Sequence, residues 1–341
     1  MENLVIANGT DARHAIVPMK DPAGYSLLAV ILKYTFSVDP KGRAEIVADG
    51  PDPYFVDQFN GDDASKSSIR KPSDLFYEKP GTDVVLVGHA HPPPVGNVSS
   101  VDVSLRVGAV AKTVRAHGVR AWRAGGPNGV SPGPARPIRE PVPLVYELAW
   151  GGLDLSDPER PVGEPRNTVG RGVARSPKSL VDQPAAQLED PAHPLSEKSP
   201  APASFGPIHR HWQPRAAFAG TYDERWETTK LPLLPDDFDL RFNVCVPHDQ
   251  WSQVPLRGDE PIEVRGATPE GAWMFSLPRL LPGFSSWVAG RRTDHRTHLD
   301  TLLIDADARR VELTFHAAIR LPRKLEMVQR ITMFEKVLAA R

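Results

Sequence analysis

The sequence predicts a mainly β fold, in which β-sandwich-like sheets carry long proline-rich loops and a short helix ends the chain. One observation is a series of short apolar or alternating segments bounded by turn residues, at 25–38, 82–90, 101–118 and 301–321. The other is the presence of 36 prolines and 26 glycines among 341 residues. Both residue types interrupt helices, and prolines remove donors from sheet ladders. We therefore expect strands joined by many turns and long ordered loops.

Two segments predict tight reversals between strands. DADARR at 305–310 separates LLI from VELTF, and DPKGRAEIV at 39–47 follows the apolar run that begins at residue 25. Asp, Pro and Gly favour turns at such positions. Each segment therefore predicts a hairpin.

Helical periodicity is confined to the end of the chain. KLEMVQRITMFEKVLAAR at 324–341 places Leu325, Val328, and Phe334 with Leu338 at helical spacings and contains no helix breaker. We predict a terminal helix over 323–341, docked on the body through its apolar stripe.

The chain divides by composition into four stretches. Residues 1–150 form an N-terminal β-rich half, 151–200 a proline- and glycine-rich insertion loop, 201–322 a C-terminal β-rich half, and 323–341 the predicted helix. A chain of this length supports two tightly joined halves or one compact domain.

Composition and charge narrow the classes of function. A hydrophobic share of 40%, a charged share of 24% and a formal net charge of -1 are typical of a soluble globular protein, with no field to attract nucleic acid or anionic lipid. The first residues lack the pattern of a secretory leader, and no window is apolar enough to cross a bilayer. We expect a cytoplasmic protein that binds neither nucleic acid nor membrane.

No motif for enzymatic chemistry stands out. The sequence contains no phosphate-binding glycine loop followed by lysine. Cys245, the single cysteine, lies between valines, which predicts a buried and inert thiol. We therefore expect no cofactor and assign no catalytic residue.

Histidine clusters carry the alternative hypothesis of a metal-dependent hydrolase. DHRTHLD places His295, His298 and Asp300 close together, and imidazole with carboxylate suits zinc, iron or nickel. Surface or hydrogen-bonded histidines are the expectation we prefer. A third hypothesis is a carbohydrate-binding β module, because tryptophans in loops can stack on sugars.

Eight segments occur in order along the chain: LKYTFSVD, SDLFYEKPGTDVVLVGHAHPP, HGVRAW, YELAWGG, NTVGRG, FGPIHRHWQPRAAFAGTYDERWETTKLPLLPDDFDLRFNVCVPHDQ, LRGDEPIEV and LDTLLIDADARRVELTFHA. Together they resemble the bacterial domain-of-unknown-function family 2169 over roughly residues 1–320. Its members are typically encoded beside genes for the type VI secretion spike (VgrG), PAAR proteins and effectors.

The resemblance implies a non-enzymatic cytoplasmic adaptor or chaperone. Such a protein would bind a secreted effector or toxin and promote its loading onto the VgrG or PAAR spike. The chain departs from the family pattern at Thr168, where proline is usual, at Trp150, where phenylalanine is usual, and at Phe315 and His316, where Trp-Arg is expected. The change at His316 removes a permanent guanidinium.

Aromatic rings and arginines in the 120–235 region are candidate partner-binding residues. Large rings with a polar handle make loop cores rigid, the role we prefer for each tryptophan, and they also anchor interfaces, where prolines lower the entropy cost of association. The candidates are Trp122, Arg123, Trp150, Arg171, Arg175, Trp212, Arg215, Tyr222 and Trp226.

The segment 220–239, GTYDERWETTKLPLLPDDFD, is predicted to be a structural clasp between the insertion and the second β half. Tyr222 and Trp226 would wedge beneath a bent backbone, so that Trp226→Ala would cost about 3 kcal/mol. The residues assigned to the clasp are Gly220, Asp223, Pro232, Pro235, Asp236 and Asp239.

Overall fold

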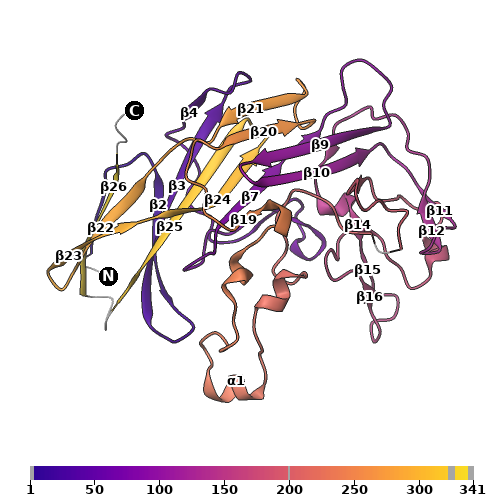
Figure 1. Ribbon diagram of the computed structural model, residues 1–341. Helices are drawn as coiled ribbons and strands as arrows, with labels where there is room; N and C mark the ends of the chain where they lie inside the picture. Colours follow the sequence, from indigo (N-terminus) through magenta and orange to yellow (C-terminus); the bar gives the residue numbers. More distant parts are fainter. Residues whose placement is uncertain (1–3, 199, 322–326, 337–341) are drawn as a thin grey trace.

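A seven-stranded sheet lies at the centre of the computed structural model, which describes residues 4–198, 200–321 and 327–336 (Figure 1). From one edge to the other it contains β19 (Trp251–Ser252), β7 (Thr82–Val87), β24 (His298–Asp305), β25 (Arg310–Arg320), β3 (Ser26–Val38) and β2 (Arg13–Lys20), with β4 (Ala44–Ile46) paired to β3. The β7–β24 pair is parallel and the other pairs are antiparallel. The 1–150 and the 201–322 regions therefore both contribute strands to one sheet.

A five-stranded sheet shares its core with the central sheet. Its order is β18 (Leu188–Glu189), β10 (Val110–His117), β9 (Ser100–Val107), β20 (Pro261–Arg265) and β21 (Ala272–Ser276). Val103 and Leu105 on β9 belong to the same buried apolar cluster as Val84 and Leu86 on β7. The mainly β fold with several sheets is confirmed, and both predicted hairpin turns, between β3 and β4 and between β24 and β25, are present.

The predicted C-terminal helix is wrong where the structure describes it. Residues Val328–Glu335 form β26, which pairs parallel with β1 (Val5–Asn8) and antiparallel with β22 (Pro282–Val288), and β23 (Arg291–Arg296) completes this four-stranded sheet. Ile331 and Met333 are buried, two positions apart, as a strand requires. Pairing with two strands outweighs the weak helical propensity of this segment. Residues 323–326 and 337–341 lie outside the described residues.

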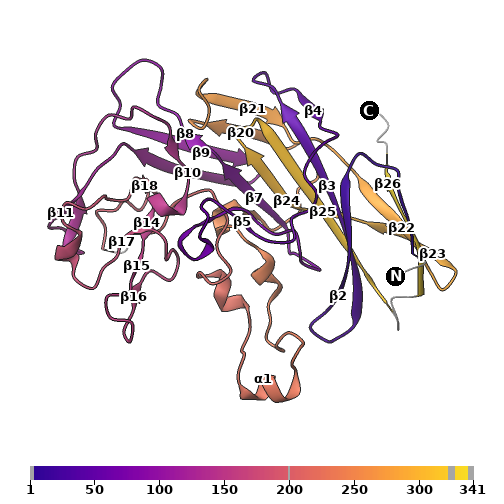
Figure 2. The same ribbon diagram turned by 180° about the vertical axis from the view of Figure 1, so that it is seen from behind.

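Short elements fill the rest of the structure, which Figure 2 shows from behind. The small strand pairs are β5 (Gln58–Phe59) with β6 (Ile69–Lys71), β8 (His89–Ala90) with β13 (Val142–Pro143), β11 (Trp122–Ala124) with β12 (Val130–Pro132), β14 (Trp150–Gly151) with β17 (Arg171–Gly172), and β15 (Leu153–Asp154) with β16 (Val162–Gly163). The 3-10 turns are Ala64–Lys66, Tyr146–Leu148, Pro177–Leu180, Arg215–Phe218, Leu240–Asn243 and His248–Gln250. The α-helix α1 (Glu224–Thr229) has six residues, which is less than two turns. Within the described ranges, no helix has the length and apolar character needed to cross a membrane.

Cys245 is buried, as its sequence setting predicts. Its Sγ lies 3.0 Å from Asp83 Oδ2, and burial raises the pKa of the thiol well above its usual range. A thiol held in its protonated form is a poor nucleophile.

Candidate protein-interaction surfaces

Trp122 and Trp150, two of the predicted partner-binding residues, lie inside the protein. Their rings meet edge to face with centroids 5.9 Å apart, and both side chains are buried. Gly172 passes directly beneath them, since a Cβ at this position would lie 2.4 Å from the ring of Trp150. Together with Val130 and Leu195 the rings form a small core separate from the main one. The structure therefore places both tryptophans in the packing of the 120–200 loops.

Trp212 and Arg215 are also buried, and each is held by hydrogen bonds. The indole N–H of Trp212 donates to Thr168 Oγ1 at 2.9 Å. Arg215 donates from Nε to the carbonyl of Phe242 at 2.7 Å and from Nη1 to that of Ile208 at 3.0 Å. The hydrogen bonds of these two side chains hold the surrounding loops in place.

The remaining predicted arginines lie nearer to solvent. Arg123 and Arg175 are exposed and Arg171 is half-buried. Arg175 is engaged by its own loop, because its guanidinium lies 3.4 Å from the Asp157 carboxylate and donates to the carbonyl of Arg160.

Residues 220–239, which we call the finger, project from the body around α1 (Figures 1 and 2). Asp223 caps α1 by accepting from the backbone N–H of Trp226 at 2.8 Å. At the neck, Asp237 accepts from the backbone N–H and the hydroxyl of Thr221 at 2.9 and 2.7 Å. Gly220 has φ +83 and packs against the buried Pro235. These contacts join the two arms of the finger to each other.

Trp226 is half-buried, so the expectation that it is wedged in a buried position is wrong. Its indole N–H donates to the carbonyl of Leu233 at 2.8 Å, and the ring of Tyr222 lies edge-on at 4.7 Å. Tyr222 is 52% exposed and Leu231 57% exposed. The finger thus carries a rigid tip with apolar groups in solvent.

The other residues assigned to the clasp surround this tip and its base. Pro232 is exposed beside Leu231, Asp236 forms an ion pair with Lys230, and Asp239 accepts from the backbone N–H of Arg241 at 2.8 Å. Over residues 220–239 the finger has six acidic and two basic side chains. Its surface is therefore strongly acidic.

The predicted histidine cluster is divided between two strands. His295 lies on β23, where its Nε2 is 2.8 Å from Ser286 Oγ and its ring stacks on Phe284. His298 Nε2 lies 2.9 Å from Asp300 Oδ1, and His316 Nδ1 lies 2.7 Å from Asp300 Oδ2. Among the described residues no three His, Cys, Asp or Glu side chains meet in a group that could hold a metal ion.

His316 links this pair to the loop that covers the central sheet. Its Nε2 lies 2.8 Å from the carbonyl oxygen of Asp74, and its ring packs on Phe76 with centroids 4.2 Å apart. His316 is therefore an interior hydrogen-bonding group.

His298→Gln should change the pH dependence of stability. The hydrogen bond to Asp300 raises the pKa of His298 from its ordinary 6.5, so its stabilisation is present in full below pH 6.5 and is lost as the pH rises through the raised value. Because the side chain is 39% exposed, we expect an effect below about 1 kcal/mol. Urea unfolding of both proteins from pH 5 to 9 measures it, and a gap between them that widens with rising pH would contradict the assignment.

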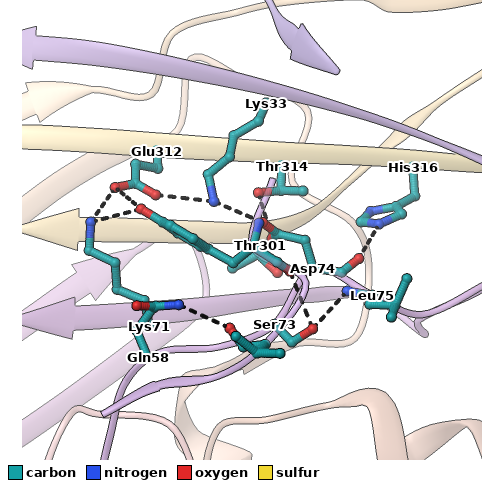
Figure 3. Close-up of polar contacts among 12 residues, drawn as sticks. Lys33, Gln58, Lys71, Ser73, Asp74, Leu75, Thr301, Glu312, Thr314 and His316 are labelled. Carbon is teal, nitrogen blue, oxygen red and sulfur yellow. Dashed lines mark hydrogen bonds and ion pairs between the residues drawn. The ribbon is translucent and has the colours of Figure 1, made fainter. Parts of the chain in front are cut away.

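A buried ionic network, which the sequence analysis did not identify, lies on one face of the central sheet (Figure 3). Lys33 Nζ lies 2.8 Å from Asp74 Oδ2 and 3.2 Å from Glu312 Oε2, and all three side chains are at most 3% exposed. Lys71 Nζ lies 2.6 Å from Glu312 Oε1. Buried charges need such partners, because an unpaired one is costly to desolvate.

Further contacts complete the network. Thr314 donates its hydroxyl to Asp74 at 3.0 Å, and the backbone N–H of Tyr54 donates to the same carboxylate at 2.8 Å. The ring of Tyr54 covers Lys33, with Nζ 3.6 Å from the centroid. Burial and the Glu312 charge raise the pKa of the Tyr54 hydroxyl. These bonds fasten the 51–76 segment to β3 and β25.

An open groove of about 740 Å³ lies between the four-stranded sheet and the central sheet. Residues from β22, β23, β24, β25 and β26 line it, together with the loops 254–258 and 278–281. Its apolar lining includes Leu281, Phe315 and Phe334, and its charged lining includes Arg257 and Arg296.

A second cavity of about 650 Å³ lies beside residues 60–70 and 143–148. Several of its charged groups already have partners: the Glu147 carboxylate accepts from the backbone N–H of Ser68 at 2.7 Å, and His89 Nδ1 lies 2.8 Å from Asp307. The groove is thus the better candidate for a binding site.

Comparison with known proteins gives one family match. The family model described as "Uncharacterized protein conserved in bacteria (DUF2169)" matches residues 23–316, which is most of the chain. No curated protein and no solved structure matches.

Proposed function

This chain belongs to the DUF2169 family of bacterial proteins, and we propose that it is a non-enzymatic adaptor or chaperone for type VI secretion. In this proposal it binds an effector or toxin in the cytoplasm and promotes the loading of that cargo onto the VgrG or PAAR spike. The genomic setting typical of the family suggests the secretion pathway. We infer the binding role from the finger.

The finger suits reversible binding of a protein for three physical reasons. It projects from the body, so that a partner can reach it from several sides (Figure 1). Tyr222 and Leu231 are more than half exposed, and aromatic and aliphatic side chains anchor interfaces. The bonds at its neck and the indole bond of Trp226 hold these groups in place before binding, which lowers the entropy cost of association.

Tyr222→Ala combined with Leu231→Ser should weaken the partner complex at least about tenfold, since two anchors are removed. The experiment first reads the neighbouring genes, co-expresses the protein with any spike and effector proteins that they encode, purifies the complexes and measures affinity by calorimetry. The melting temperature should change by no more than a few degrees, because both side chains are exposed.

Leu153→Ser is the control, since Leu153 is 46% exposed on strand β15, outside the finger, and should leave the affinity unchanged. The proposal fails if the wild-type protein forms no complex with either neighbour. If the double variant binds as tightly as the wild-type protein, the finger is not the binding surface.

A further inference from the structure

The groove between the four-stranded sheet and the central sheet has an apolar floor. Phe315 on β25 and Phe334 on β26 lie in it, and Leu281, 39% exposed, lies at its edge. Leu281 precedes β22, so the floor takes one residue from each of three segments that the fold brings together. Such a floor can accept one or two aliphatic or aromatic side chains of a ligand.

The rim of the groove is basic. Arg257, Arg279 and Arg296 are exposed and line it, and Lys336 adds a fourth positive charge. Arg279 lies 3.0 Å from the Asp259 carboxylate. For Arg257 and Arg296, the part of the chain that the structure describes contains no ion-pair partner.

One carboxylate, that of Asp294, also lines the groove, but it already has a hydrogen-bond donor and an ion-pair partner. Asp294 Oδ1 accepts from the Ser285 hydroxyl at 2.6 Å and lies 3.2 Å from Arg292 Nε. These contacts hold the pKa of Asp294 below its usual value. The field at the mouth of the groove is therefore positive and favours an anionic ligand.

We propose that this groove binds an acidic protein segment that carries an apolar anchor residue. Guanidinium groups bind carboxylates through paired hydrogen bonds, and the apolar floor supplies the anchor site between them. A segment of polypeptide fits better than a nucleic acid, because the floor offers no polar group to bases and the whole chain has a net charge of -1.

This inference rests on the proposed adaptor function and adds a second binding surface to it. The finger is acidic and the groove basic, so the two surfaces favour partners of opposite charge. An adaptor with two such surfaces can bind cargo and spike at the same time. Each surface then disfavours the partner of the other surface, because the charges repel.

Selection from a random dodecapeptide phage-display library tests the groove. We expect the purified protein to enrich peptides that combine Asp or Glu with Leu, Ile or Phe. A fluorescein-labelled copy of the most enriched peptide should then bind in an anisotropy titration. Its affinity should fall several-fold between 50 and 300 mM NaCl, because salt screens the charge interaction.

Arg257→Glu combined with Arg296→Glu should reduce the affinity for that peptide at least tenfold, and Leu281→Ser should also weaken it. Arg106→Glu combined with Arg139→Glu is the matched control, because both side chains are exposed, neither lines the groove and the charge change is the same. The control should bind like the wild-type protein. Enrichment of basic peptides, no enrichment at all, or a loss equal in both double variants would each overturn the proposal.

The finger variant separates this inference from the adaptor function. Tyr222→Ala with Leu231→Ser should bind the acidic peptide normally. If the groove binds the peptide but no spike or effector complex forms, the adaptor function alone is wrong. If the complexes form and depend on the finger but the peptide does not bind, the groove alone is wrong.

Discussion

Lys33→Met should lower the free energy of unfolding by about 3–5 kcal/mol, the usual effect of removing one partner from a buried charge cluster. The lysine lies 2.8 Å from Asp74 and 3.2 Å from Glu312, and water does not reach these groups. Without the ammonium group, Asp74 keeps neutral donors but has no countercharge. Urea unfolding at pH 7, followed by tryptophan fluorescence, measures the loss.

Two variants test whether charge balance is the cause. Arg43→Ala removes one partner of an exposed pair with Glu45 and should cost less than about 1 kcal/mol. Lys33→Met combined with Asp74→Asn should recover part of the loss, because the uncompensated carboxylate disappears. If Lys33→Met unfolds within 1 kcal/mol of the wild-type protein, the network does not fasten the covering loop to the sheet.

Trp122→Ala should cost about 3–5 kcal/mol, because a fully buried indole leaves a large cavity beside Trp150. Differential scanning calorimetry and chemical unfolding report the change. Any loss of partner binding should result from the loss of folded protein. The affinity calculated for the folded molecules alone should therefore equal that of the wild-type protein.

Trp226→Ala should destabilise the protein much less than Trp122→Ala. Its side chain is half-buried within the projecting finger, so we expect a global cost of about 1 kcal/mol or less, with local loosening of the tip. If Trp226→Ala is as destabilising as Trp122→Ala, the finger is part of the cooperative core. If Trp122→Ala melts like the wild-type protein, the small core of the 120–200 loops is not a folding unit.

The strands were predictable because their pattern is local. In β3 an apolar run is long enough to be buried on both faces, and β9 buries Val103, Leu105 and Val107 at alternate positions. In β26 the spacing of apolar residues fits both a helix and a strand. Only the neighbouring strands β1 and β22 decide between them, and the sequence does not show which strands will be neighbours.

The ionic network was not predictable as a set, because Lys33, Asp74 and Glu312 are far apart in the chain. One signal was present: Lys33 interrupts the apolar run AVILKYTFSV. A lysine at the centre of a strand buried on both faces requires a buried carboxylate. That argument predicts a partner without saying which of the acidic residues it is.

The candidate binding surfaces were also only partly predictable from the sequence. The sequence identified the aromatic residues of the 120–235 region, but it could not tell an interior ring such as Trp150 from an exposed one such as Tyr222. The groove was missed because Arg257, Leu281 and Phe334 come from separate segments. His295 and His298, which the sequence suggested as metal ligands, also line this groove.

The pairing of β3 has a consequence for the order of events during synthesis. β3 is made early, and its neighbour on one side, β2, is already present, but its other neighbour, β25, begins only at Arg310. Until the ribosome has passed that point, β3 presents a long apolar edge with unpaired backbone groups. We therefore expect slow assembly, so expression at low temperature should raise the soluble yield.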